Sequence, residues 1–338
     1  MSTRTASAER IATVTDDEDA GDSGAGATAR PRPSYVLARA AVRAVERVSP
    51  NFVRITLGGD DLDDFGTPGE VFDARIKLVF PPDSGILPPI SPDTDDWWGD
   101  YLAVPEGERG SMRTYSVREL RVTDVATEVV VDFVLHLEPG LTGPASRWAS
   151  TASVGDELLV IGPRRGRTDR SGIEYAPGAA TSVVLAGDET AAPAIARILE
   201  DAPRDLRGIA FLEVPSTQDE LAIDAPDGVE VHWLARGDAA HGLRLIPTVL
   251  DYLGDGDAGA EITVTDVEGD ALVWETPIYS GLGEDVTGVG HATDRYFWIA
   301  GESGVVTTLR RHLVKDLGID RAQVAFMGYW RRGVAMRG

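Results

Sequence analysis

An arginine, a tyrosine and a serine lie close together in the segment MRTYSVREL, residues 112–120. The segment is typical of a strand, on which Arg113 and Tyr115 share one face and Ser116 lies on the other or is turned by a bulge. A ligand that is anionic at one end and aromatic at the other would need such a combination, because the guanidinium fork pairs with phosphate and the ring packs on an aromatic group.

A second candidate is the junction TGPASRWAS, residues 142–150, where small residues precede a predicted helix. Gly143 permits a close approach of the backbone, Pro144 suits the first helical turn, and Ser146 offers a hydroxyl. Free N–H groups at a helix N-terminus bind phosphate. A plain loop-to-helix junction is the alternative interpretation, because helix caps outnumber anion sites.

A third candidate is LAGDETAAPAIA, residues 185–196, which follows a buried strand. Open α/β sheets bind ligands at such strand ends. A dinucleotide fingerprint has glycine where this chain has Asp188 and Glu189, and two carboxylates would repel a pyrophosphate. A turn with an acidic N-cap is therefore the alternative.

Three further residues have less distinctive surroundings. The chain has only two lysines, and one of them, Lys77, lies in the predicted strand ARIKLVF on the face opposite Ile76 and Leu78. It is either functional or a solvated lysine on a barrel exterior. Arg331 follows the aromatic pair of GYWRRG, residues 328–333, and His136 closes a strand before a loop. A single histidine is more often structural than catalytic.

The elements that must position these residues fall into two groups. Short alternating strands with turn signals between residues 35 and 163 predict a small antiparallel barrel, interrupted by a long loop at 81–111. From residue 181, apolar strands alternate with helical patterns, which predicts a parallel sheet with crossover helices. We expect a disordered acidic tail at 1–33, a barrel domain at 34–176 and an α/β domain at 177–338 with an insertion near 254–292.

Composition excludes several classes of function. The formal charge is −23, which disfavours binding of nucleic acid or of an anionic membrane. The absence of cysteine excludes disulfides, thiolate metal sites and iron–sulfur clusters, and five scattered histidines argue against a protein-held metal. No apolar run reaches about 18 residues, and the N-terminus lacks the apolar core of a signal peptide, so we expect no membrane insertion and a cytoplasmic location.

In this order, RIKLVFP, MRTYSVR, VDFVLH, GPASRWA, LAGDETAAPAIARILE, FWIAGESGVVTTLRRHL and GYWRRG resemble the siderophore-interacting protein family. These are ferric-siderophore reductases of the ferredoxin–NADP reductase superfamily. The resemblance covers about residues 35–333. It implies an antiparallel Greek-key FAD-binding barrel followed by a parallel-sheet nicotinamide-binding domain, FAD held without a covalent bond, and NAD(P)H as electron donor.

The resemblance also implies roles for single residues. Arg113 would pair with a flavin phosphate, Tyr115 would pack on the flavin, and Ser116 would lie near its reactive edge. Basic residues at the flavin entrance, matched by Lys77 and Arg331, would attract the anionic substrate and take the catalytic positions. The remaining cofactor-binding positions would be His136, Ala145, Ser146, Trp148, Asp188, Thr190, Ala191 and Trp330.

We expect a monomeric NAD(P)H-dependent reductase that uses FAD to reduce siderophore-bound Fe(III) to Fe(II). Its partners would be a ferric siderophore and a nicotinamide or a small electron-donor protein. Two alternatives are a general flavin or electron-transfer reductase, and a non-catalytic siderophore-binding flavoprotein. The chain departs from the family where LEPGLT, residues 137–142, separates His136 from GPAS, and at 254–292, which leaves substrate shape open.

Overall fold

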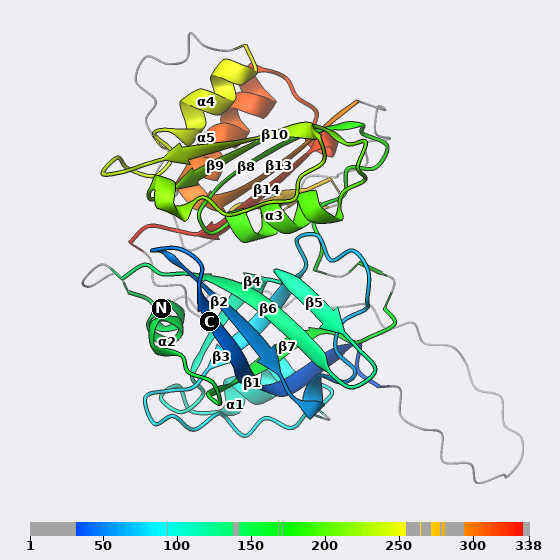
Figure 1. The fold of residues 1–338 in the computed structure, drawn as a ribbon, viewed down its shortest axis with the longest axis vertical. Coiled ribbons are helices and arrows are strands. Elements are labelled where there is room, and N and C mark those ends of the chain that lie inside the picture. The colour runs from blue at the N-terminus through cyan, green and yellow to red at the C-terminus, as the bar shows by residue number, and fades with distance from the viewer. Residues whose placement is uncertain are drawn as a thin grey trace, which may run out of the picture. The chain divides into compact units, whose positions relative to one another are not determined.

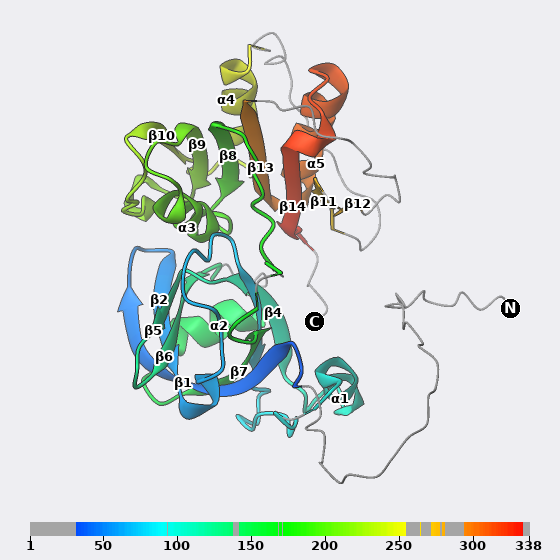
Figure 2. The ribbon, with the colours of Figure 1, turned by 90° about the vertical axis from the view of Figure 1, so that its right-hand side faces the viewer.

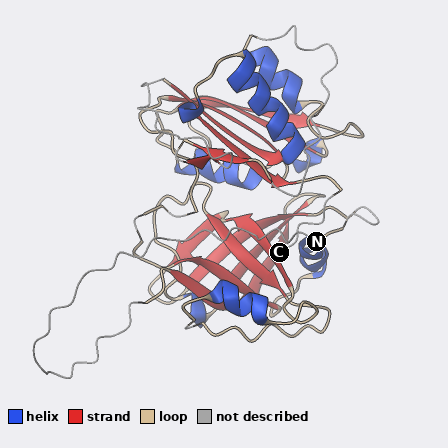
Figure 3. Cartoon of the chain, turned by 180° about the vertical axis from the view of Figure 1, so that it is seen from behind, coloured by secondary structure: helices blue, strands red, loops and turns tan. Residues whose placement is uncertain are grey.

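The computed structural model describes residues 32–92, 94–137, 142–167, 169–170, 172–254, 264, 272–277, 279–280 and 294–333. The predicted disordered tail lies outside these residues except for its last two positions, and so does most of the predicted insertion at 254–292. Residues 33–338 form one unit, in which two sheets follow one another along the chain. Figure 3 distinguishes their helices and strands by colour.

The first sheet is antiparallel, has seven strands and curls into a half-barrel. Its spatial order is β4-β3-β7-β1-β2-β6-β5, so the edge strands β4 and β5 are consecutive in the sequence (Figure 1). The strands are β1 (Tyr35–Arg47), β2 (Phe52–Gly58), β3 (Arg75–Phe80), β4 (Ser111–Ser116), β5 (Glu119–Val122), β6 (Thr127–Val134) and β7 (Glu157–Pro163). The predicted antiparallel barrel is confirmed in this form.

Side-chain alternation explains why this sheet curls around one core. On β3, Ile76, Leu78 and Phe80 face the interior, while Lys77 is exposed. The interior cluster is closed by helix α2 (Pro144–Thr151), which contacts β2, β3, β4 and β6. Burying one face of each strand in this way stabilises the sheet through the hydrophobic effect.

The long loop at 81–111 covers part of the outer face of the sheet and carries helix α1 (Trp97–Ala103), which Figure 2 shows beside the barrel strands. The side chains of Leu87, Ile90 and Tyr101 in this loop pack on Val79 of β3 and on β1 and β7. The loop is therefore a folded cover of the barrel.

The second sheet is mixed, with the order β10-β9-β8-β13-β14-β11-β12. Its strands are β8 (Ser182–Asp188), β9 (Arg207–Val214), β10 (Gly228–Ala235), β11 (Trp274–Thr276), β12 (Tyr279–Ser280), β13 (Arg295–Glu302) and β14 (Val324–Trp330). The first five in spatial order are parallel, as predicted. The hairpin β11–β12, which lies within the predicted insertion, adds two antiparallel strands at the β14 edge.

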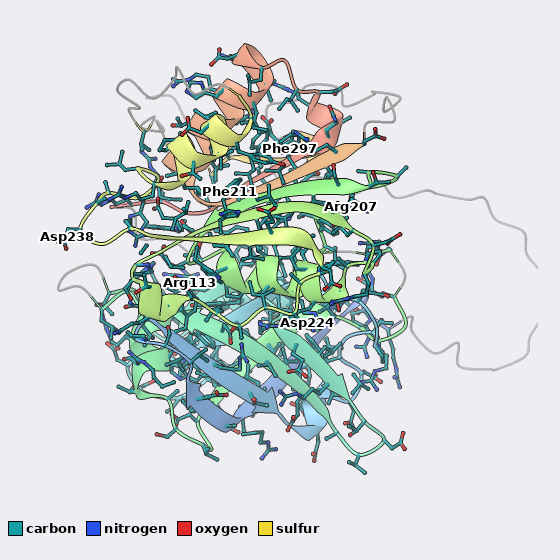
Figure 4. The ribbon with its side chains drawn as sticks, turned by 45° about the horizontal axis from the view of Figure 1, so that its top comes forward. Arg113, Arg207, Phe211, Asp224, Asp238 and Phe297 are labelled. Atoms are coloured by element: carbon teal, nitrogen blue, oxygen red, sulfur yellow. The ribbon has the colours of Figure 1, made fainter. Side chains whose placement is uncertain are left out.

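Helices cover both faces of this sheet (Figure 1). Helix α3 (Ala192–Asp201) packs on one face, and α4 (Leu245–Tyr252) and α5 (Ser303–Arg311) pack on the other, over Phe211 and Phe297, which Figure 4 labels. Coverage on both sides explains why the central strands are almost continuously apolar. Helix α5 continues into a π-helical turn at His312–Asp316.

Three aspartates connect the barrel to the second sheet. Asp201 accepts hydrogen bonds from the backbone N–H groups of residues 71 and 72 (2.8 and 2.9 Å). Asp219 accepts from the Ser49 hydroxyl (2.7 Å) and from the backbone N–H of Asn51 (2.9 Å). Asp73 accepts from the Trp298 indole N–H (2.9 Å). No helix in the described part of the chain is long and apolar enough to cross a membrane.

Candidate functional site

Arg113 and Tyr115 lie on the same face of β4, as the alternation predicted. The Tyr115 ring packs into the barrel interior against Phe133, with ring centroids 4.6 Å apart, and burial raises the pKa of its hydroxyl. Arg113 donates from Nη1 to the Met112 carbonyl oxygen (2.6 Å). Partial burial lowers the pKa of Arg113, and no carboxylate of the described residues neutralises it. A half-buried guanidinium without a carboxylate partner is suited to an anionic ligand.

Helix α2 supplies a second feature suited to anions. Its N-cap, Gly143, makes no side-chain hydrogen bond to the helix, and its first turn contains no acidic residue. The first N–H groups of the helix are therefore not satisfied by a side-chain cap. Ala145 and Ser146 are buried in this turn, where the Ser146 hydroxyl accepts from the backbone N–H of His136 (3.2 Å) and donates to the Val134 carbonyl oxygen (2.9 Å).

Trp148 on α2 packs between Phe80 and Phe133, with centroid distances of 5.2 and 5.9 Å. The same two phenylalanines contact Tyr115, so the structure brings Trp148 and Tyr115 to one aromatic cluster. Ser116 is half-buried at the end of β4, where it pairs with Arg75 of β3.

Lys77 lies on the outer face of β3. Its ammonium group donates to the Thr114 hydroxyl (2.7 Å) on the neighbouring strand. Desolvation lowers the pKa of Lys77, and the positive charge of Arg75 lowers it further. Arg331 follows β14, the last strand of the second sheet, so the two proposed substrate-binding cations come from different sheets.

The carboxyl ends of the second sheet hold a buried network around Glu189. Both oxygens of Glu189 accept from Arg236, at 2.9 Å each, and Oε1 also bonds to the Nε2 atoms of His136 (3.2 Å) and His241 (3.1 Å). Burial alone would raise the pKa of Glu189, but these hydrogen bonds and the guanidinium charge hold it well below its usual range. Because an ionised carboxylate only accepts, both imidazoles must carry a proton on Nε2.

Trp330 is held by the adjacent carboxylate. Asp188 Oδ2 accepts from the Trp330 indole N–H (2.8 Å) and from the backbone N–H of Glu302 (2.7 Å), while Oδ1 accepts from the Thr190 N–H and hydroxyl. The Trp330 ring packs on both His136 and His241, at centroid distances of 5.4 and 4.8 Å. Burial and the charge of Glu189 raise the pKa of Asp188.

Of the predicted residues, His136, Ser146, Asp188, Thr190 and Trp330 are therefore brought together, and Ala191 is buried at the N-cap of α3 beside them. The sequence interpretation missed Glu189, Arg236 and His241 as members of this cluster. The sequence did contain a signal, because a charged residue lies at or next to the carboxyl end of each of β8, β9 and β10 (Asp188, Glu213 and Arg236), and parallel strands bring these ends to one edge of the sheet. Glu213, the penultimate residue of β9, accepts a hydrogen bond from Arg236 (3.4 Å).

Two imidazoles and a carboxylate that converge also raise the question of a metal ion. Arg236 occupies both oxygens of Glu189, and a cation placed there would face the guanidinium charge. Among the described residues, no group of three or more His, Asp or Glu side chains is arranged to hold a metal ion.

Each half of the chain matches a domain of a known protein family. Residues 41–167 match the siderophore-interacting FAD-binding domain, and residues 180–333 match the siderophore-interacting protein domain. The chain belongs to the siderophore-interacting protein family. An uncharacterized protein of Mycobacterium tuberculosis is 37% identical over 299 residues, which cover 86% of this chain and 89% of the relative.

Two other relatives of the family carry functional names. The ferric vibriobactin reductase of Vibrio cholerae is 30% identical over 288 residues, covering 85% of this chain and 86% of that protein. The NADPH-dependent ferric-chelate reductase of Escherichia coli is 30% identical over 297 residues, covering 86% and 91%. Among solved structures, a siderophore utilization protein from T. fusca is similar, with a TM-score of 0.63, 32% identity and coverage of 90% and 95%.

FAD is the cofactor of the barrel domain of this family, and the residues present here fit it. A diphosphate carries negative charge, which the helix N-terminus of α2 and Arg113, a cation with no carboxylate partner among the described residues, can compensate. Tyr115 and Trp148 supply aromatic surface beside these groups. The residue roles that the resemblance implied remain proposals, which binding measurements on single variants can test.

Proposed function

We propose that this protein is a NAD(P)H-dependent ferric-siderophore reductase that uses FAD. The observation that carries the proposal is the match, along 85–86% of the chain, to two relatives named as ferric reductases. The geometry supports it, because the FAD-binding half has a half-buried arginine with no carboxylate partner among the described residues, and a helix N-terminus without a side-chain cap.

Bound FAD would accept a hydride from the nicotinamide and pass electrons singly to iron. The part of the protein is to bind and orient the reactants. Arg113 and the first turn of α2 would hold the diphosphate of FAD, and Tyr115 and Trp148 would line the space beside it. His136 and Trp330, fixed through Glu189 and Asp188, form a rigid wall at the carboxyl edge of the second sheet.

The ferric siderophore is the substrate, and its approach depends on local charge. A chain with a formal charge of −23 repels an anionic chelate. The surface where the chelate first binds, called the landing site below, therefore needs cations within about a Debye length of the chelate, roughly 8–10 Å. We assign Lys77 and Arg331 to this role. The hydrogen bond from Lys77 to Thr114 fixes its ammonium group without neutralising it.

The test is anaerobic reduction of the purified full-length protein by NADPH or NADH, followed by mixing with a ferric siderophore and an Fe(II) chelator. The expected result is bleaching of the flavin by the nicotinamide, and then reoxidation with formation of the Fe(II) complex. Binding of the siderophore without Fe(II) formation would indicate a non-catalytic binding protein. Reoxidation only by a protein acceptor would indicate an electron-transfer reductase. Either result would refute the proposal.

The two lysines of the chain provide a matched pair of variants. Lys77→Ala should raise the KM for an anionic ferric siderophore and weaken its dependence on salt, while flavin reduction by the nicotinamide changes little. Lys315→Ala removes an exposed lysine in the π-helical turn after α5 and should leave both steps unchanged. Equal effects of the two substitutions would refute a landing site at Lys77.

A further inference from the structure

Strand β10 lies at one end of the second sheet and has an open backbone edge (Figure 2). Among the described residues, its only strand partner is β9. Within the part of the chain that the structure describes, its backbone makes one other hydrogen bond, from the Val229 N–H to the Pro226 carbonyl oxygen (2.9 Å). An edge strand of eight residues whose outer N–H and C=O groups are unpaired can accept a further strand.

The two faces of β10 carry different side chains. Val229, Val231 and Trp233 pack on the apolar cluster that includes α3. Glu230 and His232 alternate with them on the opposite face, where their side chains are 79% and 46% exposed. The His232 Nε2 and Glu230 Oε2 atoms are 3.1 Å apart. An exposed carboxylate and an exposed imidazole therefore lie two residues apart along the open edge.

A second copy of the same strand fits this edge in an antiparallel arrangement. With the two-fold axis at Val231, residue 230 of each copy lies opposite residue 232 of the other copy. Glu230 then faces His232 of the second copy, and the same pair forms twice. Pairs of opposite charge that lie directly opposite each other stabilise a sheet. An imidazole also donates a hydrogen bond to a carboxylate from its neutral Nε2–H form.

The neighbouring registers are less favourable. An axis between two residues mixes the faces and brings an apolar side chain opposite a polar one, such as Val231 opposite His232. An axis at residue 230 places two glutamates directly opposite each other, and like charges in this position destabilise a sheet. An axis at residue 232 places two histidines opposite each other. The strand is therefore self-complementary in the register centred on Val231.

An exposed aromatic side chain lies beside this edge. Tyr252, the last residue of α4, is 43% exposed. Its ring packs on Phe211 of β9, which also contacts the His232 ring, with centroid distances of 5.6 Å in both cases. Tyrosine is enriched in interfaces between proteins. Because one strand and few side chains of each copy take part, we expect a small interface and a dimer that dissociates on dilution.

We propose that β10 is a self-association surface, through which two copies of this chain pair edge to edge as a two-fold symmetric dimer. Each copy contributes the same residues to such an interface. The monomer expected from the sequence is then the dissociated form. Arg236 directly follows β10 and holds Glu189, so the dimer also supports the strand that positions this arginine. The proposal depends neither on the flavin nor on ferric reduction.

The test measures the molecular mass of the full-length protein in solution, by analytical ultracentrifugation at rising protein concentration. The parent protein should approach twice the monomer mass. His232→Glu places two carboxylates opposite each other in each cross-strand pair, and Glu230→Lys/His232→Lys places two ammonium groups there. Each of these variants alone should remain monomeric at concentrations at which the parent protein is dimeric.

A mixture of the two variants should regain the dimer mass, because every glutamate then faces a lysine. Both variants keep a large net negative charge, so attraction between whole molecules would not explain this result. Glu70→Lys is the matched control, because Glu70 is exposed outside β10, and this variant should dimerise like the parent protein. A parent protein that stays monomeric, single variants that dimerise like the parent, or a mixture that stays monomeric would each overturn the proposal.

Discussion

Replacing Arg236 with alanine tests whether Glu189 is held as a buried anion. Both residues are buried, and Arg236 donates two 2.9 Å hydrogen bonds to a carboxylate with no solvent exposure. Removing one partner of a buried pair costs about 3–5 kcal/mol, because the remaining charge is left uncompensated. At roughly 2–4 °C per kcal/mol, the melting temperature should fall by roughly 6–20 °C at pH 7.

The loss of stability in Arg236→Ala should depend on pH, in a direction set by the pKa of Glu189. The pKa of Glu189 is depressed in the folded protein, so its stabilising contribution is present above the unfolded-state value, about 4.3, and is lost as the pH falls through the folded value. In Arg236→Ala this pKa should rise. The difference in melting temperature from the parent protein should therefore shrink between pH 7 and pH 5.

The measurement is thermal unfolding at a fixed FAD concentration, since bound cofactor adds its own stability. Arg204→Ala is the control, because the Arg204–Asp224 pair is exposed and should contribute less than about 1 kcal/mol. The double variant Glu189→Gln/Arg236→Met removes both charges, so its melting temperature should be much closer to that of the parent protein than the melting temperature of Arg236→Ala is. A change below 2 °C in Arg236→Ala, or a double variant as unstable as the single one, would refute the reasoning.

Three further outcomes are expected. Arg113→Ala should lose FAD on ultrafiltration, because a charge-assisted contact is worth about 1.5–3 kcal/mol, or roughly ten- to hundredfold in affinity; full flavin occupancy would contradict this. Asp219→Asn should lower the urea midpoint of unfolding at pH 7. Burial raises the pKa of Asp219, but its hydrogen bonds lower it by a larger amount, so the net pKa in the folded protein is below the usual value. The stabilising contribution of Asp219 is lost as the pH falls through this folded value, so the difference in urea midpoint between the variant and the parent protein should narrow below about pH 4. Gly301→Ala should lower the free energy of unfolding more than Gly69→Ala, as measured by circular dichroism. Both glycines have positive φ (138° and 126°), but only at Gly301 would an added Cβ lie 2.7 Å from the Asp188 carboxylate. Equal losses in the two variants would count against this contact.

The two architectures were predictable from local patterns. Alternation on β3 separates Lys77 from Ile76 and Leu78, and the apolar runs of β8 and β13 indicate strands covered on both faces. The segment of β11 and β12 was predicted only as an insertion. Its antiparallel addition to the β14 edge could not be predicted, because it depends on pairing with residues more than 40 positions away.

The candidate site was predictable in part. Arg113, Tyr115 and the start of α2 follow from residue types and local spacing. The Glu189 network does not, because Arg236 and His241 reach the carboxylate from 47 and 52 positions away, through a loop whose path depends on tertiary packing. Asp188 and Glu189 are adjacent, yet burial raises the pKa of Asp188, while hydrogen bonds from two imidazoles and a guanidinium lower the pKa of Glu189. Residue type alone could therefore not assign their charge.

The three aspartates that join the barrel to the second sheet have a consequence for building chimeras. Asp201 binds two backbone N–H groups of the barrel and Asp219 binds the N–H of Asn51, whereas Asp73 of the barrel binds the indole N–H of Trp298 in the second sheet. Every residue except proline presents a backbone N–H, so the backbone contacts of Asp201 and Asp219 place little demand on the side chains opposite, while the contact of Asp73 needs a tryptophan at position 298. A barrel from one relative should therefore combine with the α/β half of another if these acids and Trp298 are retained, which makes flavin-site and substrate-site properties separable by recombination.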